Sequence, residues 1–241
     1  IAALFDGGTT QGGWYDPSGN NVAWRRNLLT YTEQFDNAAW TKYASSVTAN
    51  ASIAPDGTTT ADLLYPASSG TNRDVWKIQA GGNIVSVFAK PAGKNWIGIF
   101  NIADALIAAW FNVSTGQVGT VTAGYSASIS AQANGFYRCV LICPSGSTFT
   151  VFDVAVVDGD NTNAVTANGS DGVYLWGAQL EQNSSATTYQ KIVTPEITYL
   201  ADVQPQPILY QDYTGTTPVY AVEQPVGLML DKSKGLVLGA E

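Results

Sequence analysis

The sequence predicts an all-β protein built around a two-sheet jelly-roll sandwich. Short β-prone segments follow one another from residue 27, separated by turn signals about every eight to twelve residues. Only 12% of the residues are charged and 11% are aromatic, a composition that favours strands over helices. The segments are apolar on one face and rich in Ser, Thr and Asn on the other, which favours two stacked sheets over a closed barrel.

The most apolar predicted strand begins at residue 172, with the sequence GVYLWGAQLEQNSSATTYQKI over residues 172–192. Val173 and Leu175 fall on one face of an extended chain, and Tyr174 and Trp176 fall on the other. Both faces need cover, so we expect an interior strand and a core position for Trp176. A polar loop over 181–185 and a short strand over 186–189 then close the domain near residue 192.

The other strands are predicted from the same alternation of apolar and polar residues. The region 27–42 is expected to contain a first strand, a turn at 35–37 and a plug of the core at Trp40. Pro55, Asp56 and Gly57 predict a tight turn, because Pro presets φ and Gly accepts a positive φ. Further strands are predicted over 47–53, 61–65, 74–78, 84–90, 96–102, 108–113, 117–122, 136–143 and 149–157.

The two ends differ from this region in composition. Residues 1–26 are Gly-rich and predict an arm anchored by Trp14 and Tyr15. Residues 194–241 are interrupted by five prolines, which disfavour central strands. We expect an extended assembly segment that lies along another subunit, with packing on its own sandwich as the alternative. The apolar Leu228 and Met229 are its candidate contacts, and the first residue is not Met, which suggests a piece of a longer chain.

Charge and residue usage exclude several classes of function. The net charge is −8, and the 11 basic residues are scattered, so a nucleic-acid partner is not expected. The chain has no histidine, which removes Ser-His-Asp triads and His-ligated zinc. No apolar run approaches the roughly 20 residues of a membrane helix. Cys139 and Cys143 would lie roughly 13 Å apart in one strand, too far for a disulfide, so we expect buried thiols.

Candidate binding chemistry centres on aromatic residues next to polar loops. Sugars are bound by an aromatic face with planar polar side chains beside it. Trp76 is favoured because the polar loop 68–74 before it carries Arg73 and Asp74, and Trp96, Trp110 and Tyr125 are further platforms. The alternative for each tryptophan is core packing.

Metal binding and catalysis receive less support from the residues. Asp158 and Asp160 place oxygen ligands in one loop, but the spacing does not match a calcium loop, and a plain acidic turn is favoured. We therefore expect no cofactor, with a structural calcium ion as the alternative. No pair of carboxylates has an apolar setting that marks a hydrolase, so we expect no enzyme activity.

Four segments together resemble a carbohydrate-binding-module-like jelly-roll domain found in structural proteins of tailed bacteriophages. They are NLLTYTEQFDNAAWTK (27–42), PDGTTTADLL (55–64), VSVFAKPAG (85–93) and VYLWGAQLEQNSSATTYQ (173–190). The flanking sequences GGWYDPS (12–18) and 210–239 are similar to a module that recurs in phage virion proteins. The jelly roll, residues 27–193, would then be inserted between them, which would place Trp14 and Tyr210 in one unit.

The resemblance implies a non-enzymatic virion component, a tail fibre, tail appendage or head-decoration subunit made in the cytoplasm of the bacterial host. Its implied partners are other virion proteins and further copies of itself, with a trimer favoured by analogy. The alternative is an adhesin that binds a glycan on the host surface. Related modules sometimes hold a structural ion, for which Asp62 or Glu181 would be ligands here; the alternative for Glu181 is hydrogen bonding to backbone amides.

Overall fold

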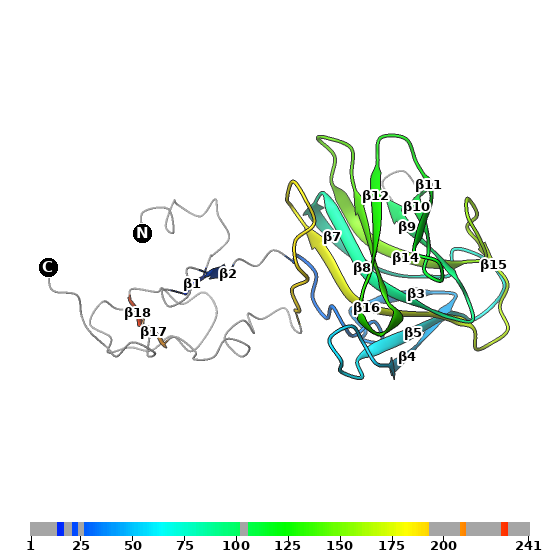
Figure 1. The fold of residues 1–241 in the computed structure, drawn as a ribbon, viewed down its shortest axis with the longest axis horizontal. Coiled ribbons are helices and arrows are strands. Elements are labelled where there is room, and N and C mark those ends of the chain that lie inside the picture. Colours follow the sequence, from blue (N-terminus) through cyan, green and yellow to red (C-terminus); the bar gives the residue numbers. More distant parts are fainter. Residues whose placement is uncertain are drawn as a thin grey trace, which may run out of the picture. The chain divides into compact units, whose positions relative to one another are not determined.

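The computed structural model describes residues 27–101 and 106–192, together with the backbone of four short strands in the flanks (Figure 1). The chain divides into two units, one formed by Arg26–Val193 and the other by Ile1–Arg25 with Thr194–Glu241. In the second unit, β1 (Trp14–Asp16) pairs with β2 (Asn21–Ala23), and β17 (Ile208–Tyr210) pairs with β18 (Leu228–Leu230). The side chains of Trp14, Tyr15, Tyr210, Leu228 and Met229, our candidate assembly contacts, lie outside the described residues.

The unit Arg26–Val193 is a sandwich of two six-stranded antiparallel sheets (Figure 1). The first sheet has the order β11-β10-β9-β14-β7-β3, and the second β12-β13-β8-β16-β5-β4. The strands of the first sheet are β3 (Thr41–Tyr43), β7 (Asp74–Gly82), β9 (Trp96–Asn101), β10 (Leu106–Asn112), β11 (Gln117–Val121) and β14 (Phe149–Val157). Those of the second are β4 (Ser45–Ser52), β5 (Ala61–Pro66), β8 (Ile84–Ala92), β12 (Ser126–Ala131), β13 (Tyr137–Ile142) and β16 (Gly172–Glu181). The predicted all-β sandwich is confirmed, and the jelly-roll connectivity stays a prediction.

One large core fills the space between the sheets. Its members come from the inward positions of both sheets, such as Val75 and Val154 from the first and Val87 and Leu175 from the second. The predicted interior strand is β16, which lies between β8 and β5 and is buried along nearly its whole length. Trp176 lies on the outer face of this strand and is only 5% exposed, which confirms its predicted burial.

The first predicted strand, within 27–42, is wrong. Residues 27–40 form a series of turns, and the strand there is the short β3 at Thr41–Tyr43. Leu29, Phe35 and Trp40 are buried in the main core, so this loop closes one open end of the sandwich with the apolar residues that suggested a strand. The predicted plug is confirmed, because Trp40 is 1% exposed and packs edge-on against Phe152.

The structure also tests the predictions for the two cysteines, for the turn at 55–57 and for the strand at 186–189. Cys139 and Cys143 are buried thiols that are not joined in a disulfide, as predicted. The turn at 55–57 is also confirmed, since Gly57 has a φ of +88° and the Asp56 side chain accepts a hydrogen bond from the Thr58 amide. The predicted strand over 186–189 is wrong, because these residues run as an irregular segment after β16.

The irregular segment after β16, residues 186–192, lies against the loop at the beginning of the sandwich, residues 27–33. The Thr32 amide donates to the Ile192 carbonyl (3.0 Å), and the Ile192 amide donates to Thr32 Oγ1 (2.9 Å). The Asn27 side-chain amide donates to the carbonyls of Ala178 and Gln190. We call residues 27–33 with 187–192 the seam, since they join the beginning and the end of the sandwich.

Candidate functional site

The outer face of the first sheet contains the favoured sequence-predicted residues. Along β7, Asp74, Trp76 and Ile78 alternate with the inward-facing Val75, so they share the outer face. The register pairs Trp76 with Asp153 of β14 and Asp74 with Tyr43 of β3. Directly opposed residues of antiparallel strands share a face. We call these five residues, Tyr43, Asp74, Trp76, Ile78 and Asp153, the β3–β7 face.

Apolar surface on the β3–β7 face is open to solvent. Ile78 is 71% exposed and Tyr43 is 57% exposed, and Trp76 between them is half-buried. These are two of the three large hydrophobic residues that are exposed among the described residues, the third being Ile53. An aromatic ring with exposed apolar neighbours is the arrangement that stacks on the C–H groups of a ligand.

The other predicted tryptophan platforms on this sheet are covered. Trp110 is 8% exposed and packs in a second apolar cluster with Phe100, Ala155 and Val157, against which Trp96 is half-buried. The Trp110 ring nitrogen donates to the Thr162 carbonyl at 2.6 Å, so the loop after β14 lies over it. Trp110 therefore presents no free ring face.

Tyr125, the remaining candidate platform, is partly buried and packs against the main core. Among the four predicted platforms, Trp76 is thus the ring that stands beside exposed apolar side chains.

The Arg73 side chain is committed to its own loop. Nε and Nη2 donate to the carbonyls of Ser68 (2.7 Å) and Ser69 (2.8 Å), and Nη1 donates to that of Thr71. We predicted that Arg73 would donate to a ligand. Its guanidinium instead holds the loop before β7 in shape. This local role could not be read from the sequence, because it depends on the turn that the loop makes.

The β3–β7 face also holds two buried carboxylic acids. Asp74 is 5% exposed and Asp153 is 3% exposed, and the Oδ1 atom of each is buried without a hydrogen-bond partner. Burial raises the pKa of Asp74 to about 6, against the lowering effect of Arg73. Burial and the nearby charge of Asp74 raise the pKa of Asp153 to about 8. Asp153 was not singled out from the sequence, although a lone Asp inside the apolar run FTVFDVAVV was a signal.

Asp158 and Asp160, the candidate calcium ligands, are bonded to protein groups. Asp158 forms an ion pair with Lys94 (2.6 Å) and accepts from the Thr166 amide. Although partial burial acts to raise it, these partners hold the pKa of Asp158 below its ordinary value. Asp160 accepts from the amide and the hydroxyl of Thr120. In the two described ranges, no group of three or more acidic or thiol side chains is arranged to hold a metal ion.

Asp62 and Glu181, the other candidate ion ligands, bind backbone and side-chain donors. Asp62 accepts hydrogen bonds from the amides of Phe35 (2.7 Å) and Asn50 (2.9 Å). Glu181 accepts from both the amide (3.0 Å) and the hydroxyl (2.6 Å) of Thr187. The interpretation in which Glu181 bonds a backbone amide is therefore confirmed, and both acids fix loops to the second sheet.

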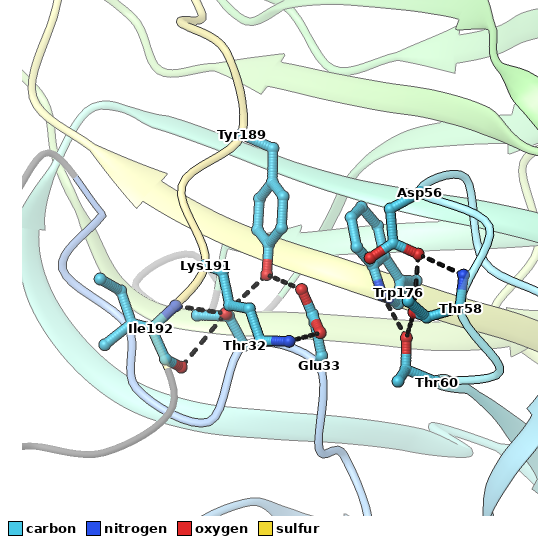
Figure 2. Close-up of polar contacts among 9 residues, drawn as sticks. All are labelled: Thr32, Glu33, Asp56, Thr58, Thr60, Trp176, Tyr189, Lys191 and Ile192. Atoms are coloured by element: carbon cyan, nitrogen blue, oxygen red, sulfur yellow. Dashed lines mark hydrogen bonds and ion pairs between the residues drawn. The ribbon is translucent and has the colours of Figure 1, made fainter. Parts of the chain in front are cut away.

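A polar cavity of about 310 Å³ lies at the seam, lined by loop 31–37, Asn50, Thr60, Asp62 and residues 191–192. Figure 2 shows the groups beside it: Tyr189 points its hydroxyl toward Thr32 and Glu33, and the Lys191 ammonium lies 2.8 Å from Glu33 Oε2. Burial raises the pKa of Glu33 above its ordinary value, against the opposing effects of Lys191 and Tyr189. These contacts hold the seam together, so we assign the charged groups a structural role.

Comparison of the chain with models of known protein families and with curated proteins gave no significant match. Within the described part of the chain, the search for a helix with the length and apolar character of a membrane span found none.

Proposed function

We propose that this protein is a non-enzymatic structural component of a phage virion and that its sandwich acts there as a glycan-binding adhesin. The virion assignment is supported by the resemblance of residues 27–190 and of the flanks to phage structural proteins. Glycan binding is supported by one observation above all. Trp76 stands on an open sheet face between the exposed Tyr43 and Ile78.

The chemistry of this face suits a sugar ring. An indole stacks on the apolar C–H face of a pyranose, and neighbouring exposed side chains widen the contact. Exposed aromatic and apolar groups that lie together on a surface commonly mark a binding site. The loop carbonyls at 68–71 are already paired with Arg73, so the loop beside Trp76 is held in shape.

A binding role is favoured over hydrolysis at this face. The two acids beside Trp76 have buried Oδ1 atoms, whereas a glycosidase needs both carboxyl groups open to the scissile bond. Release of reducing ends from host polysaccharide by the purified chain would contradict the non-enzymatic assignment.

The full chain should be tested on an array of host-surface glycans, followed by calorimetry with the ligands found. We expect Trp76→Ala to weaken binding by at least about tenfold, the loss of roughly 1.4 kcal/mol of stacking. The matched control is Ile53→Ala, which removes a 52% exposed apolar side chain away from the face. Binding to no glycan, or equal loss in both variants with folding retained, would contradict the adhesin assignment and leave a structural role alone.

A further inference from the structure

We propose that Asp74 and Asp153 share one proton across strands β7 and β14, and that loss of this proton weakens ligand binding at the β3–β7 face. The inference rests on the proposed function only in its second half. The first half concerns the sandwich itself and can be measured without a ligand.

The strand register brings the two acids together. Asp153 is opposite Trp76, and Asp74 is opposite Ala155, so the two acids are diagonal neighbours on one face of adjacent antiparallel strands. Diagonal neighbours have their Cβ atoms within about 7–8 Å, and two carboxyl groups that lean toward each other can span this separation.

Both acids are withdrawn from water. Each is at least 95% buried by its fractional exposure, 5% for Asp74 and 3% for Asp153, and each has a buried Oδ1 atom without a partner. Two buried negative charges repel each other, and a buried acceptor without a donor is costly. A single proton removes both costs, because it neutralises one acid and supplies a donor to the other.

The charged side chains near the two acids do not donate hydrogen bonds to their buried Oδ1 atoms. Arg73 lies near enough to lower the pKa of Asp74, but its nitrogens already donate to the carbonyls of loop 68–71. The neighbouring strand β3 contributes Thr41 and Tyr43 to this face, and Gly98 of β9 lies opposite Ala155. Lys77 alternates to the other side of β7, where its ammonium bonds to Thr30.

The direction of the pH effect follows from the raised pKa values. A folded state that holds protons more tightly than the unfolded chain loses stability as the pH rises. For Asp74 the loss occurs between about pH 4 and about 6, and for Asp153 it extends to about 8. Full ionisation therefore places two repelling charges beside Trp76, which displaces the ring from its position on the face.

The first experiment measures the urea midpoint of the full chain from about pH 7 to about pH 8, above the range in which Asp62 titrates and below the ordinary thiol pKa of about 8.5, where ionisation of the buried Cys139 in the unfolded chain would add its own slope. We expect the midpoint to fall with pH in the wild type and to stay flat in Asp153→Asn, which resembles the protonated acid. Asp160→Asn, an exposed acid bonded to Thr120, is the matched control and should keep the wild-type slope. A flat wild-type profile overturns the proposal, as does an unchanged slope in Asp153→Asn.

If Asp153→Asn fails to fold, titration of the carboxyl groups of the wild type by NMR tests the proposal instead. We expect both acids to respond to the same two titration steps, the second of them above about pH 6, as coupled groups do. Two independent titrations near the ordinary aspartate pKa of about 4 overturn the proposal.

The second half is tested with the tightest glycan found on the array. We expect its affinity to fall by about tenfold between about pH 6 and about pH 9, and the Asp153→Asn variant to lose this dependence. Equal affinity at both pH values overturns the regulation of binding. If no glycan binds at any pH, the adhesin assignment fails, while the urea and NMR results still decide whether the proton is shared.

Discussion

The hydroxyl oxygen of Tyr189 lies 2.7 Å from the hydroxyl oxygen of Thr32, and this contact joins the last segment of the sandwich to its first. The same hydroxyl donates to Glu33 at 3.1 Å (Figure 2). We expect Tyr189→Phe to lower the free energy of unfolding by about 1–2 kcal/mol, because two buried partners lose a hydrogen bond. Urea unfolding measures it.

The control for this variant is Tyr174→Phe. Tyr174 is a half-buried tyrosine whose ring lies beside the Lys90 ammonium, and its change should stay within about 0.5 kcal/mol. Similar losses in the two variants would show that the seam bond contributes nothing of its own.

Asp62 fixes the loop that closes the sandwich, since it accepts the Phe35 and Asn50 amides. We expect Asp62→Ala to destabilise the fold by about 2–4 kcal/mol, because buried amides lose their acceptor.

Burial raises the pKa of Asp62 to about 6. The wild type should therefore lose stability as the pH rises from about 4 through about 6, and Asp62→Ala should lack that part of the profile. Thermal unfolding across this range is the measurement, with Asp160→Asn, an exposed acid bonded to Thr120, as the control. A profile that Asp62→Ala leaves unchanged contradicts the assignment.

The two thiols should be inert in the folded protein. Cys139 is fully buried, and burial raises the pKa of its thiol above the ordinary value, so thiolate is not available. A thiol-reactive dye should label neither Cys139 nor Cys143 in native buffer and both in denaturant. Rapid labelling of the native protein would be inconsistent with this packing.

Gly177 interrupts β16 with a φ of +63° at the bulge between Trp176 and Gln179. A Cβ atom there would lie 2.8 Å from Phe88 Cδ2. We expect Gly177→Ala to cost about 2–4 kcal/mol, from backbone strain and overpacking together.

Gly146 separates the two effects. It has a φ of +82° but open space where its Cβ would stand, so Gly146→Ala should cost only the strain, about 1–2 kcal/mol. Chemical denaturation of both variants tests the difference, and equal costs would exclude a steric role of Phe88.

The sequence predicts strands best where large apolar residues alternate. The limits of β14 at Phe149–Val157 agree with the prediction, and those of β8 differ by two residues. β12 was missed because its sequence, SASISA, carries small polar residues and lies at the edge of a sheet. Residues 27–40 were predicted partly as a strand because they include several apolar residues. Those side chains are buried in the core, but the backbone that carries them is a loop at the end of the sandwich.

The site was predictable only in its local part. Asp74 and Trp76 are two residues apart, so their shared face follows from strand geometry. Tyr43 and Asp153 join them through pairing between strands distant in sequence, and this register cannot be read from one strand alone. The covering of Trp110 by the loop at Thr162 is likewise a tertiary effect.

The seam has a mechanical consequence. Because residues 27–33 and 187–192 are bonded side by side, the chain enters and leaves the sandwich at neighbouring points. A tension applied through residues 26 and 193 would therefore load the seam bonds first, without passing along the strands of either sheet. The force would pass from one end of the domain to the other through the seam hydrogen bonds. The two sheets would keep their strand register until those bonds had broken.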